Sequence, residues 1–249
     1  MTGSGAKRVG RAVAQRLAAA GCNIVLHANT SVTMADPAAQ QIASEFGVKT
    51  HVVSGDLADG QVPQQLIDQT LQWAGEIGVL VNCAAIWHPT PLESVTPEMV
   101  DRYWAINARA GFLLARAAGL RMVQQSDGGS IVNIGDWGCQ RPYIDHAAYF
   151  PSKGSIETMT RSLAVELGRR NPVVRVNCVH PGPVLLPEDC DSERALAAAD
   201  STLVGRVGTA EEVAHAVQFL CENQFVTGSS VYVDGGRAIY ANEPATWKG

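Results

Sequence analysis

The chain has 249 residues, of which 46% are hydrophobic and 17% are charged, and its formal net charge at pH 7 is -5. This length and composition predict one globular domain over residues 1–249 with a sizeable core. The negative charge argues against nucleic acid or an anionic membrane as a partner. The six cysteines lack metal-ligand spacing, and we see no signal peptide or long apolar span. We therefore expect reduced thiols, no metal and a cytoplasmic location.

A glycine-rich turn followed by a helix opens the chain. Residues 2–10 read Thr-Gly-Ser-Gly-Ala-Lys-Arg-Val-Gly, and apolar residues then recur at helical spacing until Gly21. Glycines let a backbone approach a pyrophosphate, and a helix N-terminus supplies N–H donors and a positive dipole end. We predict cofactor contacts from the residues of this turn, namely Gly3, Ser4, Gly5, Lys7, Arg8 and Val9.

Strand and helix patterns alternate along the rest of the chain. Strands are expected over 22–28, 48–53, 79–83, 130–134, 173–179 and 231–233, and helices over 38–46, 62–73 and 155–170. A long helix should begin with Thr96 as its cap and Pro97 in its first turn, and a last one with a capping box from Thr209 to Glu212. This order predicts an α/β, doubly wound Rossmann-type domain with a mostly parallel sheet.

The stretch from Asp136 to Lys153 contains the residues with the clearest chemistry. Tyr149 and Lys153 are four residues apart, at the start of a helix that Pro151 restricts to begin nearby, so both lie on one helix face. A nearby ammonium group favours the phenolate and is expected to lower the pKa of Tyr149. The phenol would then be a usable proton donor.

With these motifs the sequence resembles the short-chain dehydrogenase/reductase family over essentially its whole length. The resemblance implies that Tyr149 is the catalytic acid, that Lys153 also binds the cofactor ribose, and that Asn107 joins a proton relay. The family's usual serine falls on Asp136, and an ionised carboxylate can only accept hydrogen bonds. This departure favours a substrate that presents N–H donors over an ordinary ketone.

The loop from Ile86 to Leu92 narrows the resemblance to the pteridine reductase branch. It reads Ile-Trp-His-Pro-Thr-Pro-Leu, and that branch has an aromatic followed after one residue by Pro-Thr-Pro-Leu, together with an Asp at the serine position. The resemblance implies that Trp87 stacks on a pterin ring. The alternative is an aromatic side chain packed beneath the loop. The expected substrate contacts are Trp87, Asp136, Tyr149 and Pro183.

The residues after the second strand indicate the cofactor. No acidic residue occurs there before Asp36, whereas proteins that prefer NAD generally place a carboxylate at this point. We therefore expect NADP(H), with contacts from His27, Asn29, Thr30 and Ser31. The family resemblance adds Asp56, Leu57, Asn82, Ala84, Pro181, Gly182 and Val184. By itself, Asp56 would be an ordinary helix cap.

The chain begins where the first strand of this family should already have ended. Because that strand lies in the middle of the sheet, we expect a central gap with unpaired backbone groups on both neighbours. Either the start of the sequence is placed too late, or the chain rearranges around the gap.

The favoured function is NADPH-dependent reduction of a pterin or folate, with Tyr149 as the proton donor. One alternative is a carbonyl reductase acting on a 3-oxoacyl thioester or on a sugar or steroid ketone. A second is a non-catalytic NADP-binding module. The family also implies a homotetramer.

Overall fold

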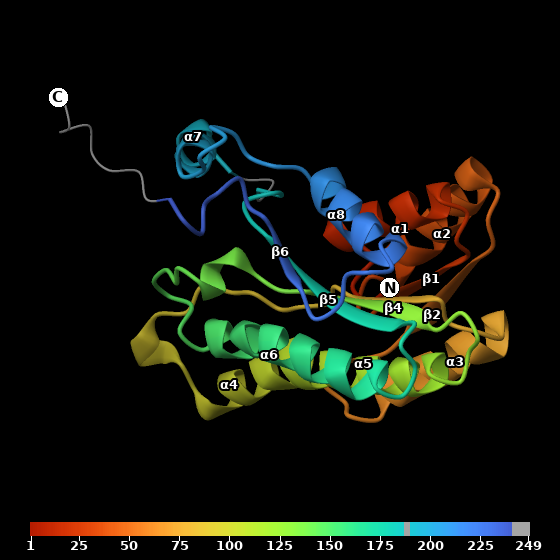
Figure 1. The fold of residues 1–249 in the computed structure, drawn as a ribbon. Helices are drawn as coiled ribbons and strands as arrows, with labels where there is room; N and C mark the ends of the chain where they lie inside the picture. The colour runs from red at the N-terminus through yellow and green to blue at the C-terminus, as the bar shows by residue number, and fades with distance from the viewer. Residues whose placement is uncertain (187–189, 241–249) are drawn as a thin grey trace.

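The computed structural model describes residues 1–186 and 190–240 and has the predicted α/β architecture (Figure 1). Its strands are β1 (Ile24–Ala28), β2 (Thr50–Ser54), β3 (Val79–Asn82), β4 (Gly129–Ile134), β5 (Val174–Pro181) and β6 (Ser230–Val233). Each paired strand runs parallel to its neighbour. The predicted doubly wound fold is therefore confirmed.

Helices cover both faces of the strands. They are α1 (Val9–Ala19), α2 (Val32–Phe46), α3 (Val62–Ala74), α4 (Pro97–Tyr103), α5 (Ala110–Met122), α6 (Tyr149–Gly168), α7 (Ser192–Asp200) and α8 (Ala210–Glu222). A π-helical turn, η2 (Trp104–Arg109), joins α4 to α5, and short 3-10 turns are η1 (Leu92–Ser94) and η3 (Trp137–Cys139). In Figure 1, α1, α2 and α8 lie on one side of the strands, and α3, α4, α5 and α6 lie on the other.

Most helix boundaries follow the sequence. The Thr96 side chain accepts a hydrogen bond from the Met99 N–H, and Thr209 forms a complete capping box with Glu212. Helix α6 begins at Tyr149 and places Pro151 in its first turn, as expected.

Helix α2 is longer than predicted, because it begins at Val32 and contains Pro37. Its first turns carry Ala35, which is fully buried, whereas Pro37 faces solvent. Burial of Ala35 and its neighbours therefore offsets the backbone hydrogen bond that a proline removes.

The predicted central gap is present, since β1 and β2 form one sheet and β3, β4, β5 and β6 form another. Met1–Ser4 lies between the two. The Met1 amino group donates to the Val25 carbonyl at 3.0 Å, and the Met1 carbonyl accepts from the His27 N–H at 3.0 Å. On the other side, the Thr2 N–H donates to the Val81 carbonyl at 3.1 Å. This short segment pairs with both neighbours of the gap, so the expectation that their backbone groups are left unpaired is corrected in part.

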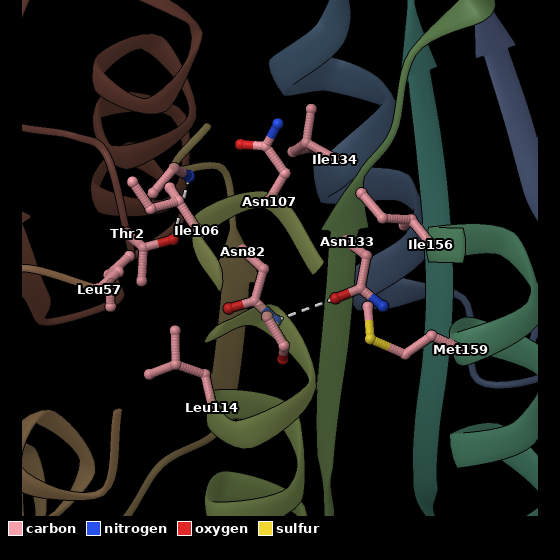
Figure 2. Close-up of a pocket in the computed structure, with 12 residues that line it drawn as sticks. Thr2, Leu57, Asn82, Ile106, Asn107, Leu114, Asn133, Ile134, Ile156 and Met159 are labelled. Atoms are coloured by element: carbon pink, nitrogen blue, oxygen red, sulfur yellow. Dashed lines mark hydrogen bonds between the residues drawn. The ribbon is translucent and has the colours of Figure 1, made fainter. Parts of the chain in front are cut away.

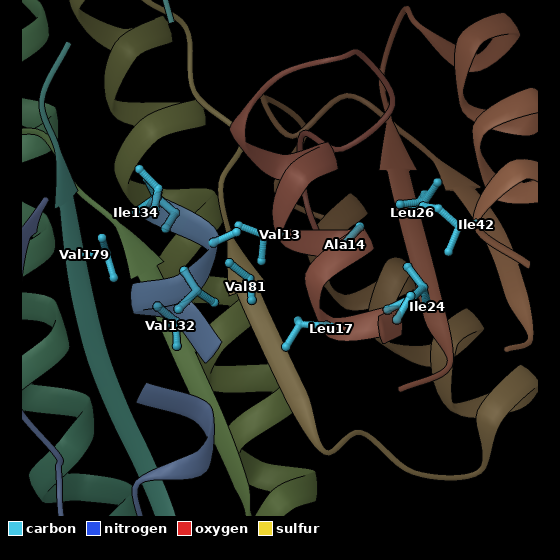
Figure 3. Packing of buried hydrophobic residues seen from close by; sticks show 14 of the residues in the cluster. Val13, Ala14, Leu17, Ile24, Leu26, Ile42, Val81, Val132, Ile134 and Val179 are labelled. Carbon is cyan, nitrogen blue, oxygen red and sulfur yellow. The ribbon is translucent and has the colours of Figure 1, made fainter. Parts of the chain in front are cut away.

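Apolar side chains also connect the two sheets. Val13 and Leu17 of α1 belong to one buried cluster with Ile24 of β1 and Val81 of β3 (Figure 3). Complete burial of a Val, Leu or Ile side chain stabilises a fold by about 1.5–3 kcal/mol. The core therefore extends across the gap, and the carboxyl ends of the strands remain aligned at one edge.

Candidate active site

Asp136 and Tyr149 meet at this edge. Asp136 follows β4, and its Oδ1 accepts from the Gly138 N–H at 2.7 Å, which fixes the carboxylate at the start of η3. Tyr149 is the first residue of α6, is only 3% exposed, and donates its phenolic proton to Asp136 Oδ2 at 2.6 Å. This short, charge-assisted bond ties the two side chains into one unit.

The pKa of Tyr149 is raised above that of a free phenol, which corrects the expectation that Lys153 lowers it. The largest cause is burial, followed by the negative charge of Asp136 and the hydrogen bond to it. The Lys153 ammonium group is itself buried and donates to the Ile134 carbonyl at 2.8 Å. Tyr149 consequently stays protonated at neutral pH, which is the form that can donate a proton.

Asn107 lies within the π-helical turn η2 and anchors the loop after β3. Its Oδ1 accepts from the Ile86 N–H at 2.8 Å, and its Nδ2 donates to the Ile86 carbonyl at 3.0 Å and to Ser152 Oγ at 3.2 Å. The side chain thus joins the Trp87 loop to the first turn of α6. Its part in a proton relay remains a prediction.

Trp87 lies at the mouth of the site and is 46% exposed. One face of its indole stacks on the His146 ring, with centroids 4.8 Å apart, and its Nε1 donates to the Tyr143 hydroxyl at 3.1 Å. The side chain is therefore held by aromatic neighbours, and it is still partly open to solvent. His146 thus provides a stacking partner on one face of the indole, and the stacking of Trp87 on a substrate ring remains a prediction.

His146 is a site residue that the sequence analysis missed. It is 6% exposed, and its ring lies 6.2 Å from the Tyr149 ring. Nδ1 lies 2.8 Å from the Ile144 carbonyl, which can only accept, so Nδ1 carries the proton and Nε2 is an acceptor. Nε2 is buried, and no group in the described part of the chain pairs with it. A histidine three residues before Tyr149 was the available clue.

The glycine-rich turn can hold a phosphate group. Helix α1 has no side-chain cap at its N-terminus, and Lys7 and Arg8 are exposed beside it. Gly3 has a φ of +63°, and a Cβ there would lie 2.7 Å from the Ala84 Cα, so this position requires glycine. An open helix N-terminus with two nearby cations fits the pyrophosphate of a dinucleotide. The exposed Asn29 and Thr30 and the half-buried Ser31 follow β1.

Two predicted cofactor contacts, Ser4 and His27, turn their side chains inward, so a contact with the cofactor would have to come from their backbone. Ser4 Oγ donates to the Met1 carbonyl at 3.1 Å and accepts from the His27 N–H at 3.1 Å. His27 is only 3% exposed. Its ring Nε2 lies 3.0 Å from the Gly55 carbonyl oxygen, and its Nδ1 accepts from the Gly3 N–H at 3.4 Å. Both side chains are therefore buried, and their hydrogen bonds stabilise the turn from inside the protein.

Residues at the ends of β2 and β3 also have structural roles. Asp56 Oδ1 accepts from the Ala58 N–H at 2.9 Å, as a cap would, and Leu57 is 4% exposed. Asn82 Nδ2 donates to Asn133 Oδ1 at 2.9 Å, which links β3 to β4 (Figure 2). The cavity in Figure 2 has a volume of about 10 Å³, which is far too small for a substrate.

The predicted nicotinamide loop follows β5. The Gly182 N–H donates to the Val233 carbonyl at 2.9 Å, and the Pro183 carbonyl accepts from the Gly208 N–H at 2.9 Å. Pro181 ends the strand, and Val184 is buried. The predicted substrate lid over 185–204 contains α7, and its residues 187–189 lie outside the described part of the chain.

Metal ligand clusters and membrane-spanning helices are both lacking over residues 1–186 and 190–240. No group of three or more His, Cys, Asp or Glu in these ranges could hold a metal ion. No helix there is long and apolar enough to span a bilayer.

Comparison with known proteins gives a consistent result. The profile of a family described as "Enoyl-(Acyl carrier protein) reductase" matches residues 5–238. The chain is 33% identical to an L-xylulose reductase from Bos taurus over 242 residues, which covers 95% of this chain and 94% of that one.

Two solved structures have the same fold. The first is a blue fluorescent protein from a metagenomic library in complex with NADPH, with a TM-score of 0.87, 33% identity and coverage of 95% and 96% of the two chains. The second is acetoin dehydrogenase from Enterobacter cloacae, with a TM-score of 0.87, 26% identity and coverage of 98% and 96%. None of these relatives is described as acting on a pterin.

Proposed function

This chain belongs to the short-chain dehydrogenase/reductase family and is an NAD(P)-dependent oxidoreductase, and we propose that it reduces hydroxyl-bearing ketones or keto sugars with NADPH. This substrate class corresponds to the carbonyl-reductase alternative of the sequence analysis, and it takes precedence over pterin reduction.

The observation that carries the proposal is the unpaired acceptor of His146. Its Nε2 is buried beside Tyr149, and an unsatisfied buried acceptor costs about 1–3 kcal/mol. Because Nε2 is closed to solvent, the aromatic rings that pack on His146, such as Trp87, would have to move for a substrate to reach it. A substrate hydroxyl that then donates to Nε2 would remove this cost while its carbonyl lies near the Tyr149 phenol. A simple ketone has no such donor.

The names of the relatives support the same class. L-xylulose and acetoin, the compounds named for two relatives, are both ketones with a hydroxyl group on the carbon next to the carbonyl. In this proposal, His146 recognises that neighbouring hydroxyl group.

The residues around Tyr149 would handle the proton. When bound, NADPH supplies the hydride. Tyr149 holds a proton on its Oη and passes it to the carbonyl oxygen, and the raised pKa of the phenol keeps that proton in place until reduction. Asp136 holds the hydroxyl through the 2.6 Å bond, and the phenolic proton turns from Asp136 to the substrate carbonyl oxygen for the transfer. Lys153, at the base of the site, would bind the ribose hydroxyls.

A preference for NADPH over NADH rests on charge. The turn after β1 offers the exposed Asn29 and Thr30 and no carboxylate, and Lys7 and Arg8 stand exposed at the N-terminus of α1. These donors and cations favour a 2'-phosphate, whereas an acidic residue would repel it.

Pterin reduction is the second candidate. Asp136 favours it, because a carboxylate at this position can accept from a ring N–H, and the open face of Trp87 could stack on a flat heterocycle. The names of the relatives do not support it.

The test measures NADPH oxidation with acetoin, butan-2-one, L-xylulose, dihydrobiopterin and a β-keto thioester. Acetoin and butan-2-one differ only in the hydroxyl group, so we expect kcat/KM to favour acetoin by about 10-fold or more. His146→Phe should remove that preference, and the exposed His215→Phe should retain it. Equal turnover of both ketones, or turnover of dihydrobiopterin alone, would contradict the proposal.

Self-association and location are further expectations. A groove of about 770 Å³ along η2 and α5 is lined by Trp104 and Phe112, each 42% exposed, and we propose it as a contact surface of the homotetramer. Phe112→Glu should lower the mass measured by light scattering. The cysteines are all free thiols, which suits the proposed cytoplasmic location.

A further inference from the structure

A fully buried histidine lies directly behind the Asp136 peptide. His180 of β5 is 0% exposed. Its Nδ1 is 3.2 Å from the Asp136 nitrogen and 3.3 Å from the Asp136 carbonyl oxygen.

The surrounding groups fix the protonation of this ring. Nδ1 faces both the Asp136 N–H and the Asp136 carbonyl oxygen, so this contact alone fits either neutral tautomer. The Glu157 carboxylate beside Nε2 favours the tautomer with its proton on Nε2, in which Nδ1 accepts from the Asp136 N–H. Nε2 lies 3.3 Å from Glu157 Oε1, which also accepts from the Tyr232 hydroxyl at 3.1 Å. The His180 and Tyr232 rings stack with centroids 4.6 Å apart. The ring is thus held at both nitrogens and on one face.

We propose that His180 is a positioning residue that holds the Asp136 peptide, so that the Asp136 carboxylate reaches Tyr149, and that Glu157 selects the ring tautomer that makes this possible. The proposal rests on the proposed role of Tyr149 as proton donor. The same logic of a carboxylate orienting a histidine operates in catalytic triads, although here the histidine acts on a backbone group.

Close packing confirms the position of the ring. A Cβ added to Gly135 would lie 2.5 Å from His180 Cε1, so glycine is required beside the ring. The Gly135 N–H donates to the Val179 carbonyl at 2.8 Å, which fixes the strand on which His180 lies. The ring therefore packs directly against the backbone of the residue that precedes Asp136.

A Cys–His nucleophile is a competing explanation of the same cluster, since Cys178 Sγ lies 3.4 Å from His180 Nε2. Burial raises the pKa of the Cys178 thiol to about 12, so the sulfur stays protonated. Cys178 is also 0% exposed and cannot meet a substrate. The cluster is better suited to support than to covalent chemistry.

Protonation of His180 would undo the arrangement. Burial lowers the pKa of His180 below 6.5, although Glu157 opposes the shift. The ionisable groups that face the ring are Glu157 and Lys153 of α6, Cys178 of β5, Tyr232 of β6 and Asp136 after β4. In the protonated ring Nδ1 is a donor, so the bond from the Asp136 N–H is replaced by a bond to the Asp136 carbonyl oxygen, 3.3 Å away, and the peptide that carries the carboxylate shifts. Activity should therefore fall on the acid side as His180 becomes protonated.

The first test compares the pH dependence of kcat/KM for ketone reduction in wild type, Glu157→Gln and Glu166→Gln. Glu166 lies on the same helix, exposed and paired with Arg170, and serves as the control. Because Glu157 raises the pKa of His180, its neutral replacement should move the acid limb about half a pH unit or more toward lower pH. An unmoved limb, with ketone turnover intact, would overturn the positioning role and leave the proposed function standing.

The second test needs no substrate. In His180→Phe the Asp136 peptide loses its partner, so the hydrogen bond from the Tyr149 hydroxyl to Asp136 should weaken as the carboxylate moves away. The ¹³Cζ resonance of Tyr149 at neutral pH, assigned with Tyr149→Phe, reports this bond in the full chain. A shifted resonance in a protein that reduces no ketone would support the positioning role while the proposed function fails. An unchanged resonance in folded His180→Phe would overturn the positioning role.

Discussion

The two sheets of this protein are held together in different ways, and they carry different parts of the proposed site. Strands β3, β4, β5 and β6 form a continuous parallel ladder that ends at Asp136, Tyr149 and His180. Strands β1 and β2 stand apart, joined to that ladder through Met1–Ser4 and the core. The proposed catalytic groups are therefore positioned by a continuous hydrogen-bonded sheet, whereas the proposed cofactor turn is positioned by the short segment Met1–Ser4.

Side-chain hydrogen bonds show the same contrast. Within the larger sheet, Asn82 bonds to Asn133, and Asn133 Nδ2 donates to Thr160 Oγ1 at 2.9 Å, all three being buried. At the gap, Thr2 Oγ1 accepts from the Cys83 N–H at 3.0 Å and from the Ala84 N–H at 3.2 Å. Changes in the larger sheet should thus affect chemistry and stability most, and changes near the turn should affect cofactor binding.

The largest effect is expected from Tyr149→Phe, which removes the proton donor and keeps the packing against Tyr103 and Phe150. Loss of a general acid should lower kcat by about 10²–10⁴-fold. NADPH affinity, measured by fluorescence titration, should stay within about twofold, because the cofactor turn is untouched. A variant with near wild-type kcat would show that Tyr149 is not the acid.

Gly135→Ala should have the next largest effect. The new methyl group would collide with the His180 ring, and overpacking costs about 1–3 kcal/mol. We expect kcat to fall by about 10–100-fold, since small displacements of reacting groups are costly. Gly78→Ala is the matched control, because a Cβ at Gly78 meets nothing within 4 Å. Similar kinetics for both variants would contradict the tight packing behind Asp136.

A third comparison measures the two regions directly by urea unfolding. Asn133→Ala leaves the Asn82 amide without one partner and Thr160 without another, and should lower the free energy of unfolding by about 2 kcal/mol. Thr2→Val removes the acceptor of two N–H groups at the edge of the gap and should cost about 1 kcal/mol. A larger loss of unfolding free energy for Thr2→Val than for Asn133→Ala would mean that the bridging segment contributes more to stability than the hydrogen bonds within the larger sheet.

The smallest effect concerns the cations of the turn. Lys7→Gln and Arg8→Gln each remove an exposed charge and should lower the NADPH over NADH preference in kcat/KM by about 3–10-fold. The exposed Arg121→Gln on α5 is the control and should leave the preference unchanged. An unchanged preference in the Lys7 and Arg8 variants would mean that these two side chains serve solubility only.

Local sequence patterns predicted a large part of the site. The spacing of Tyr149, Pro151 and Lys153 placed the first turn of α6, because proline and helical periodicity act over a few residues. The position of Asp136, thirteen residues before Tyr149, indicated a carboxylate at the site, and the structure brings the two side chains together. The pKa direction of Tyr149 was wrong, since it depends on burial.

Other site residues could not be found in this way. His146 and His180 are unremarkable in the sequence, and what distinguishes them is an acceptor without a partner in one case and a backbone partner 44 residues away in the other. Ser4 and His27 were placed against the cofactor because they lie in the expected segments, yet their side chains point into the protein.

The sequence by itself determined the order of strands and helices, the family, the central gap and the placement of Tyr149 and Lys153 together on α6, because these follow from periodicity, turn residues and local spacing. Only the tertiary structure decided how Met1–Ser4 bridges the two sheets, which histidines face the site, and in which direction the pKa of Tyr149 moves. Those properties arise from burial and from contacts between segments far apart in the chain, and neither is encoded within a local stretch of sequence.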